Sequence, residues 1–299
     1  MKSIKVFYSP EYLYDGASRD TTRKAGPIAA SLAANPIANV EVVRPSRAIT
    51  ESEIAQVHSP EYSNAIVSGN DRQLADNNGL ADWTPEFAAS RLWATGGVRE
   101  AVLGALLTKC NTGSMSSGLH HARFNYGNGY CTINGLVIAA KLALQEGAKR
   151  VVILDLDAHG GGGTASLIDG VEGIEQVDVA VNGYDCYPST ANAKCTLASG
   201  HEYLEVVQRE LATIANPTDI DVLIYNAGVD PHENCSTGGA GGITTETLKT
   251  RESMVFSWAA KHEVPVAFVF AGGYISASLN EAQLVELHRN TIAAAAAHI

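Results

Sequence analysis

The sequence predicts one α/β domain, in which an open, mostly parallel β-sheet is flanked by helices on both faces. Three observations predict it. Short apolar runs alternate with longer helical patterns along the 299 residues, which is typical of βαβ units. The apolar runs are nearly continuous, as in strands covered on both faces. No linker rich in Pro, Gly or Ser and no internal repeat divides the chain, so residues 1–299 are expected to form a single domain.

The strands and helices are predicted in chain order from these patterns. Six buried strands rich in Val, Ile, Leu and Phe are expected at residues 4–8, 40–43, 151–154, 177–181, 222–225 and 266–270. Seven helices are expected at residues 25–34, 60–67, 85–107, 134–147, 202–215, 244–262 and 281–297. Gly147 fits the stop of the fourth helix. The small-residue run 111–117 is a further candidate strand with its exit loop.

Composition excludes several classes of protein. Apolar residues make up 45% and charged residues 18% of the chain, an ordinary globular balance that excludes a disordered or collagen-like chain. A net charge of -11 argues against a nucleic-acid binder and is compatible with a cationic substrate. No apolar stretch has the length of a membrane span, and the N-terminus lacks a secretion signal. Five scattered cysteines indicate reduced thiols, so a cytoplasmic location is expected.

Polar side chains follow several of the predicted strands directly. In open parallel sheets, ligands bind at the carboxyl ends of the strands. Such ends are expected to carry DLDAH at 155–159, NAGVD at 226–230 and AGGY at 271–274, with GLHH at 118–121 as a fourth cluster. A functional site is therefore expected at this edge of the sheet.

Asp157, His159 and Asp230 form a candidate metal site. Residues two apart on an extended segment point to the same side, so Asp157 and His159 can share an ion. Asp230 ends another strand and would complete a set of nitrogen and oxygen ligands with an open position, as catalytic zinc requires. The alternative is a capping and turn cluster before a helix. Asp230 at an equivalent strand end favours the metal interpretation.

Three further motifs bear on catalysis. His120 and His121 are candidate acid and base, and Asp155 could accept the N–H of one of them and fix its tautomer. Tyr274, after two glycines, could donate to a developing oxyanion. The run Gly160–Gly163 lacks the features of a phosphate loop and is expected to be a flexible turn. No GxSxG motif supplies a serine nucleophile.

Taken together, the ordered motifs resemble the metal-dependent histone deacetylase superfamily. They are GLHHA at 118–122, GYC at 129–131, DLDAH at 155–159, NAGVD at 226–230 and GGY at 272–274. The resemblance runs from about residue 10 to residue 274, and the segments 151–164 and 225–251 look most like the class IV branch. It implies an arginase-deacetylase fold and a mononuclear zinc amidohydrolase that removes an acyl group from an amine.

The resemblance also implies roles for single residues. Asp157, His159 and Asp230 would bind zinc, one ion per chain. His120 and His121 would be the tandem histidines, Asp155 the partner of His120, and Tyr274 the catalytic tyrosine. Tyr130 and Tyr187 would line the acyl tunnel, and Gly129 would offer its carbonyl to the substrate. A structural potassium ion near the end of the strand at 155–159 is a further implication. Gly161 and His232 stand where a second metal would need aspartates, which disfavours a binuclear guanidine hydrolase.

Two departures from the family pattern bear on activity. Gly160 and Gly162 stand where a polar residue and an Asp or Asn are usual, and the latter normally contacts the second tandem histidine. His121 is therefore expected to lose its orienting partner, and a slow enzyme is conceivable. The segment 18–27 lacks a histidine-rich motif that many relatives have, which would alter the tunnel or its rim.

The expected substrate is an acyl-lysine in a protein or peptide, with an acetyl or longer acyl group. A second enzymatic interpretation is an acetylpolyamine or another small amide. A third interpretation, which Gly162 motivates, is a silenced relative that binds acyl-lysine or serves as a scaffold. Retention of the ligand set, both histidines, Asp155 and Tyr274 favours an active enzyme. Neither nucleic acid nor a membrane is expected as a partner. The oligomeric state is left open.

Overall fold

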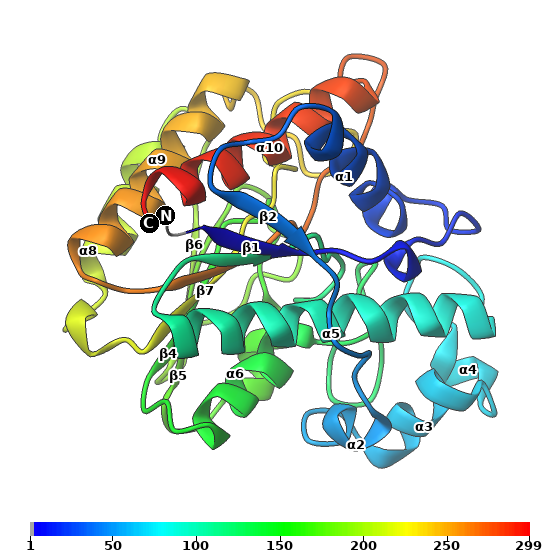
Figure 1. The fold of residues 1–299 in the computed structure, drawn as a ribbon. Coiled ribbons are helices and arrows are strands. Elements are labelled where there is room, and N and C mark those ends of the chain that lie inside the picture. The colour runs from blue at the N-terminus through cyan, green and yellow to red at the C-terminus, as the bar shows by residue number, and fades with distance from the viewer. Residues whose placement is uncertain (1–2) are drawn as a thin grey trace.

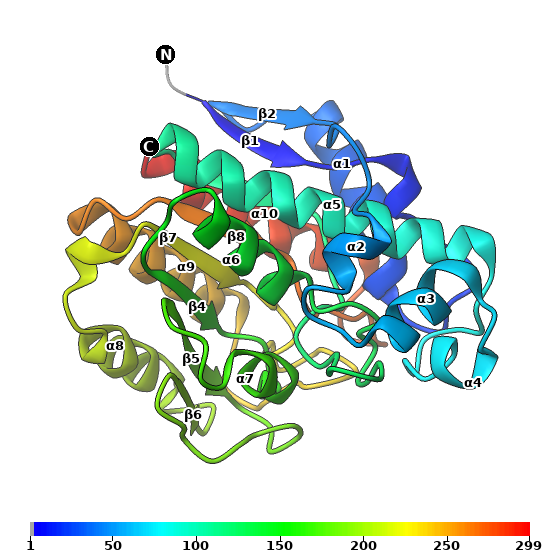
Figure 2. The same ribbon diagram turned by 90° about the horizontal axis from the view of Figure 1, so that it is seen from below.

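All eight strands of the sheet run parallel, in the order β2-β1-β3-β8-β7-β4-β5-β6 (Figures 1 and 2). The computed structural model describes residues 3–299. The strands are β1 (Ile4–Phe7), β2 (Val40–Val43), β3 (Thr112–Ser114), β4 (Val151–Asp155), β5 (Ile174–Ala180), β6 (Ala193–Leu197), β7 (Val222–Asn226) and β8 (Val266–Val269). The predicted open parallel α/β sheet is confirmed.

Helices cover both faces of the sheet. They are α1 (Ala25–Ala34), α2 (Glu51–Ile54), α3 (Pro60–Ser68), α4 (Arg72–Ala75), α5 (Pro85–Thr108), α6 (Gly135–Gln145), α7 (Gly162–Ile168), α8 (Tyr203–Thr213), α9 (Thr245–Lys261) and α10 (Glu281–Ala297). One face carries α1, α8, α9 and α10, and the other carries α5, α6 and α7 (Figures 1 and 2). The short 3-10 helices are η1 (Pro10–Tyr12), η2 (Asp20–Thr22) and η3 (Pro217–Asp219).

Two hydrophobic cores, one on each face, hold the three layers together. Every residue of β4, β7 and β8 is buried, because both faces of these central strands are covered. On β4, Val152 and Leu154 belong to one core while Val151 and Ile153 belong to the other. Each fully buried aliphatic side chain contributes about 1.5–3 kcal/mol. The central strands, whose ends position the functional site, are therefore closely packed on both faces.

Local sequence signals explain where the long helices begin. Proline follows the N-cap residue at the start of α3 and α5, where its missing N–H and fixed φ suit the first turn. Thr244 and Asn280 each form a capping box with the residue three positions on, which starts α9 and α10. None of the described helices is both long enough and apolar enough to cross a membrane.

Besides the 3-10 helices, the structure adds four elements to those predicted, and it changes two expectations. The strand at 40–43 was predicted as buried, but β2 is an edge strand whose residues are exposed or half-buried. β6, α2, α4 and α7 were not indicated by the apolar patterns; β6 is an edge strand of mixed polarity whose buried residue is Ala193. The glycine run expected as a flexible turn instead leads into α7, which begins at Gly162. Close packing explains this difference, since neighbouring backbone and side chains surround Gly162 and Gly163.

Candidate active site

The polar clusters meet because their strands are neighbours. β3, β8, β7 and β4 lie consecutively in the sheet. Since all of them run parallel, the residues that follow them emerge at one edge. The tandem histidines come after β3, Tyr274 after β8, Asp230 after β7, and Asp157 with His159 after β4. Topology alone thus assembles one site from four parts of the chain.

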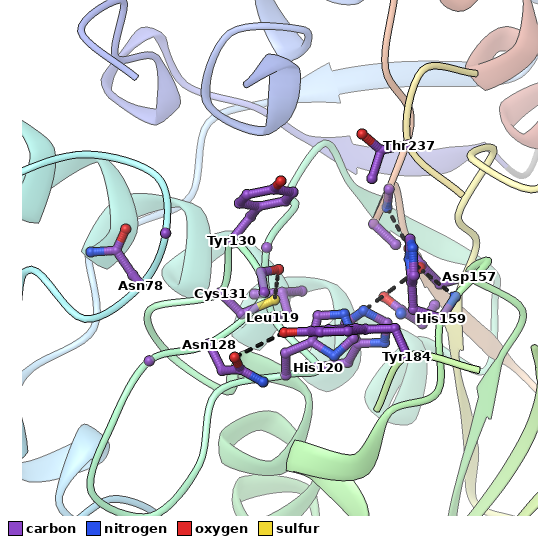
Figure 3. A pocket seen from close by; sticks show the side chains of 18 of the residues that line it. Asn78, Leu119, His120, Asn128, Tyr130, Cys131, Asp157, His159, Tyr184 and Thr237 are labelled. Carbon is purple, nitrogen blue, oxygen red and sulfur yellow. Dashed lines mark hydrogen bonds and ion pairs between the residues drawn. The ribbon is translucent and has the colours of Figure 1, made fainter. Parts of the chain in front are cut away.

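A cavity of about 560 Å³ opens at this edge. Its lining includes His120, His121, Asp157, His159 and Tyr274. Figure 3 labels His120, Asp157 and His159 among them. That volume lies within the usual range for small-molecule sites. Away from the metal-ligand group, glycines, asparagines and aromatic side chains make up most of the lining, with Asn77, Asn78, Asn128, Asn182, Tyr130 and Tyr184 among them. Leu119, Cys131, Thr237 and Ala271 complete it.

Asp157, His159 and Asp230 bring one potential ligand atom each to within 4.8 Å of one another. Nδ1 of His159 lies 3.1 Å from Oδ1 of Asp157 and 3.3 Å from Oδ2 of Asp230. Oδ2 of Asp230 is buried without a hydrogen-bond partner among the described residues. Burial and the nearby charge of Asp157 raise the pKa of Asp230 to about 6. An orphaned carboxylate oxygen between two other donors fits a divalent cation, and this donor set suits zinc.

Backbone N–H groups hold the two carboxylates in place. The N–H of Gly272 donates to Oδ2 of Asp157 over 2.7 Å, and that of Ala158 donates to Oδ1 of Asp230 over 3.0 Å. A Cβ at position 272 would lie 2.2 Å from Oδ2 of Asp230 and 2.5 Å from Oδ2 of Asp157. The site therefore requires glycine at 272, because any side chain would occupy the space of the carboxylates.

His120 is paired with Asp155. Its Nδ1 lies 2.8 Å from Oδ2 of Asp155, whose other oxygen accepts from Nδ2 of Asn226 over 2.9 Å. Burial alone would lower the pKa of His120, but the charges of Asp155 and Asp157 outweigh it and raise the pKa to about 10. The second ring nitrogen of His120 remains for the cavity, 3.7 Å from Oδ1 of Asp157.

His121 also has a carboxylate partner, which the sequence did not reveal. Its Nδ1 lies 2.8 Å from Oδ2 of Asp185, in the loop between β5 and β6. Arg123 pairs with the other oxygen of Asp185. Burial and the charge of His120 lower the pKa of His121 to about 4. The expected loss of an orienting partner is wrong for this chain, since Asp185 supplies one from another segment.

Gly162 and Asp185 fit together sterically. A Cβ at position 162 would lie 2.5 Å from the carbonyl oxygen of Asp185 and 2.6 Å from its Oδ1. A side chain at 162 therefore excludes the loop from its present place. Because residue 162 has no side chain, the carboxylate of Asp185 has room to lie beside His121.

Tyr274 lies in the cavity lining and is 6% exposed. Burial and the charges of Asp230 and Asp157 raise the pKa of its hydroxyl well above its usual range, so the hydroxyl is a proton donor. Nζ of the buried Lys24 donates to the carbonyl of Ala271, three residues before Tyr274. Ala271 adopts a left-handed backbone conformation, with φ of 47°. Lys24 thus holds a strained segment that presents the tyrosine.

A buried polar network fixes the backbone around the tandem histidines. Nδ1 of His58 donates to the carbonyl of Arg123 over 2.7 Å, and its Nε2 accepts from the N–H of Asn134 over 3.0 Å. Nδ2 of Asn134 in turn donates to the carbonyls of His120 and Ala122. His58, which lies just before α3, is fully buried and is not in the cavity lining. It joins the start of α6 to the histidine segment.

The aromatic walls differ in part from the expected ones. Tyr130 and Gly129 line the cavity, but Tyr187 does not; its hydroxyl is buried without a partner among the described residues. Tyr184 lies in the lining instead, with its ring edge-on to His121 at 5.1 Å between centroids. Its hydroxyl donates to Oδ1 of Asn128 over 2.9 Å (Figure 3). Tyr130 and Tyr184 therefore border the cavity.

Sequence reasoning missed Asp185, Arg123, Lys24 and Tyr184. No local pattern marks them, because each acts through a partner far along the chain. Gly162 was an indirect signal for Asp185. Because the segment after β4 lacks the usual carboxylate at this position, a carboxylate from another segment was to be expected. Tyr184 is one of several aromatic and acidic residues within NGYDCY at 182–187, and the sequence does not reveal which of them faces the cavity.

Comparisons with known proteins agree with this geometry. A family profile described as "Histone deacetylase domain" matches residues 19–289. An uncharacterised protein of Picosynechococcus sp. is 31% identical over 233 residues, covering 73% of this chain and 74% of that protein. Histone deacetylase 15 of Arabidopsis thaliana is 26% identical over 211 residues, which cover 62% of this chain and 37% of the plant protein. This chain thus spans well under half of that relative.

Two solved structures show the same fold. The crystal structure of the HDA15 HD domain superposes with a TM-score of 0.77 at 18% identity, covering 100% of this chain and 90% of that one. Acetylpolyamine aminohydrolase from Burkholderia pseudomallei gives a TM-score of 0.77 at 16% identity and covers 98% of both chains. At such identities these two likenesses concern the fold alone.

Proposed function

Because this chain belongs to the histone deacetylase domain family, we propose that it is a zinc-dependent amidohydrolase that removes an acyl group from the side chain of an acyl-lysine. Membership of the family makes it a hydrolytic deacetylase. The zinc, the residue roles and the substrate are the proposal. The observation that carries it is the buried ligand set of Asp157, His159 and Asp230. Two of its members, Asp157 and His159, line the same cavity as His120, His121 and Tyr274.

The proposed ligands are Asp157, His159 and Asp230. A zinc ion held there would act as a Lewis acid on the acyl carbonyl and would lower the pKa of a water molecule. The orphaned Oδ2 of Asp230 supports this assignment, because a buried carboxylate oxygen needs a partner. A structural potassium ion near the end of β4 stays a prediction.

The chain's own groups move the protons. His120 and His121 bind Asp155 and Asp185 through Nδ1, which leaves the second nitrogen of each ring for the reaction. One imidazole takes a proton from the attacking water, and one delivers a proton to the departing amine nitrogen. The amide C–N bond breaks, and a carboxylate and a free amine leave.

Tyr274 stabilises the charge that develops on the carbonyl oxygen. Its hydroxyl stays protonated at neutral pH, since burial and two nearby carboxylates oppose its ionisation. A donor held in place before the reaction loses nothing to reorganisation, which is how oxyanion sites act. Gly129, whose carbonyl was expected to accept from the substrate, lies in the lining beside Tyr130.

The scarcity of acidic residues in the lining supports acyl-lysine over acetylpolyamine. Apart from Asp157, which belongs to the ligand set, the described lining contains no acidic residue. A polyamine carries further ammonium groups, whose entry into a cavity without a counter-charge is costly. The side chain of an acyl-lysine has no charge once acylated and matches the asparagine and tyrosine walls. The fold likeness to acetylpolyamine aminohydrolase keeps the small amide as the second candidate.

The test is deacylation of fluorogenic lysine substrates that carry acetyl to myristoyl groups, beside N-acetylputrescine. We expect turnover of one or more lysine substrates, loss of it in Asp230→Ala, and full activity in the matched surface variant Asp219→Ala. Turnover of N-acetylputrescine alone would establish the second candidate. Bound zinc without turnover of any substrate would show a silenced acyl-lysine binding protein or scaffold.

A further inference from the structure

Two thiols lie together beside the loop that carries Asp185. Cys186 follows Asp185 directly and is exposed, whereas Cys195 lies within β6 and is half-buried. The Sγ–H of Cys195 points to Sγ of Cys186 over 3.4 Å. The cavity does not include either residue, and the mechanism proposed above does not use them. Their proximity is therefore unexplained by the reaction.

The two sulfurs are placed for bond formation. A disulfide needs a separation of about 2.05 Å, so the sulfurs must approach by more than 1 Å from 3.4 Å. Cys186 lies in a loop without regular structure, and Cys195 lies on the edge strand of the sheet, so the approach disturbs no central strand. Burial raises the pKa of Cys195. The exposed sulfur of Cys186 is thus the one that meets an oxidant first.

We propose that Cys186 and Cys195 form a reversible disulfide when the chain meets a peroxide. The thiolate of Cys186 attacks one peroxide oxygen, the O–O bond breaks, and a sulfenic acid and water result. The sulfur of Cys195 then attacks the sulfur of Cys186, the S–O bond breaks, and a second water leaves. The two thiols lose two electrons and two protons, and hydrogen peroxide is reduced to two waters. A dithiol reductant restores both thiols.

The disulfide would act on the active site through Asp185. The carboxylate of Asp185 contacts His121, Arg123 and the N–H of Gly163, and the carbonyl of Tyr184 accepts from the N–H of Gly160. Asp185 itself adopts a left-handed conformation with φ of 55°, so the segment has little freedom to adjust. Drawing Cys186 toward β6 pulls this segment away from the glycine run and weakens the bond from His121. This consequence for turnover rests on the function proposed above, whereas disulfide formation does not.

Non-reducing mass spectrometry of the full chain after treatment with hydrogen peroxide tests bond formation. Trypsin cleaves after Arg150, Lys194 and Arg209, so Cys186 and Cys195 fall in separate peptides, each with one cysteine. We expect a linked pair of peptides, residues 151–194 with 195–209, that a dithiol separates. Absence of that pair while another cysteine becomes oxidised would overturn the proposal.

Activity measured on the same samples tests the link to the site. We expect a roughly tenfold fall in kcat on oxidation, part of the contribution of a general base, and full recovery with a dithiol. Cys195→Ser should keep basal activity and lose the sensitivity, while the matched variant Cys110→Ser should keep the sensitivity. The proposed ligands include no thiolate, so oxidation of a metal ligand is not a competing cause. A linked peptide with unchanged kcat, or sensitivity retained in Cys195→Ser, would refute the coupling.

The failure of this inference and the failure of the proposed function are distinguishable. If no substrate is turned over, the linked peptide still decides whether the disulfide forms. If turnover is present and no linked peptide appears, the deacylase stands and the disulfide does not.

Discussion

Nδ1 of His121 lies 2.8 Å from a carboxylate oxygen of Asp185, a residue 64 positions further along the chain. The contact is possible because position 162 is glycine, whose missing side chain leaves room for the carbonyl and carboxylate of Asp185. Arg123 pairs with the second carboxylate oxygen and fixes its direction. One orienting carboxylate has thus been supplied by the loop after β5 rather than by the segment that follows β4.

Removing the carboxylate of Asp185 should slow turnover. Glycine tolerates the left-handed backbone found at this position, so Asp185→Gly removes the carboxylate without strain. We expect kcat to fall roughly 10- to 100-fold, as for other partners that orient a functional imidazole, with metal content unchanged. Steady-state kinetics and metal analysis of the purified protein measure both.

Returning a carboxylate to position 162 should rescue that loss. In Gly162→Asp combined with Asp185→Gly, the new side chain reaches His121 from the β4 segment. The collision with Oδ1 of Asp185 is gone, and glycine at 185 gives the loop the freedom to move the carbonyl that a Cβ at 162 would meet at 2.5 Å. Gly162→Asp alone should be impaired, because its side chain collides with Asp185. A double variant no better than Asp185→Gly would show that Asp185 does more than orient His121.

Tyr274→Phe should leave the metal site intact and cut turnover by roughly 10²–10³, the usual effect of losing one oxyanion donor. The ring keeps its packing near Tyr130, where the two centroids lie 6.1 Å apart. kcat with bound zinc measured on the same sample is the readout. Unchanged kcat would remove Tyr274 from the proposed mechanism.

Gly272→Ala should weaken zinc binding, because the added methyl group displaces the carboxylate ligands. Its Cβ would lie 2.2 Å from Oδ2 of Asp230, which must then move. We expect zinc affinity to fall roughly 10- to 100-fold, measured by competition with a chelator. Gly241→Ala is the matched control, because a Cβ there has no neighbour within 4 Å. Equal affinity in the two variants would contradict the assigned ligand set.

Stability should fall in mild acid because of His58. Burial lowers the pKa of His58 to about 4 in the folded protein, against about 6.5 when unfolded. The unfolded chain therefore binds more protons between these values, and the contribution of His58 is complete above pH 6.5 and lost as the pH falls toward 4. From pH 7 to pH 5 this loss is about 2 kcal/mol.

A variant that does not titrate isolates the effect of His58. His58→Gln can still donate to the carbonyl of Arg123 and accept from the N–H of Asn134. Urea unfolding at both pH values should show that the wild type loses about 2 kcal/mol more than the variant. Parallel losses in the two proteins would mean that the folded protein does not lower the pKa of His58.

Sequence reasoning predicted the elements whose patterns are long or strongly apolar. The bounds of α1, α10 and β2 match the predicted ones at both ends. The edge strand β6 escaped because it is only five residues long, buries one of them and has no continuous apolar run. The metal ligands, the tandem histidines and Tyr274 were predicted from their motifs. All of them except Asp230, which contacts His159, line one cavity. Their roles stay predictions, as does the likeness to the class IV branch.

The part of the site that could not be predicted is the part that depends on loops. Asp185 acts through a hydrogen bond to a residue after another strand, and Lys24 acts through the carbonyl of Ala271, 247 residues further along the chain. Tyr184 lines the cavity and Tyr187, three residues on, does not. Which side chain faces the cavity depends on the local path of the loop backbone. A loop has no periodic sequence pattern from which that path could be predicted.

The order of the strands in the sheet determines when activity returns during refolding. β3, β8, β7 and β4 are neighbours in space but lie between residues 112 and 269 in the chain. Parallel pairing of this kind joins distant segments late in folding. The active centre therefore exists in no shorter half of the protein and in no partly assembled sheet. Recovered turnover during refolding would report completion of the whole central sheet, and it should lag behind the return of helical signal.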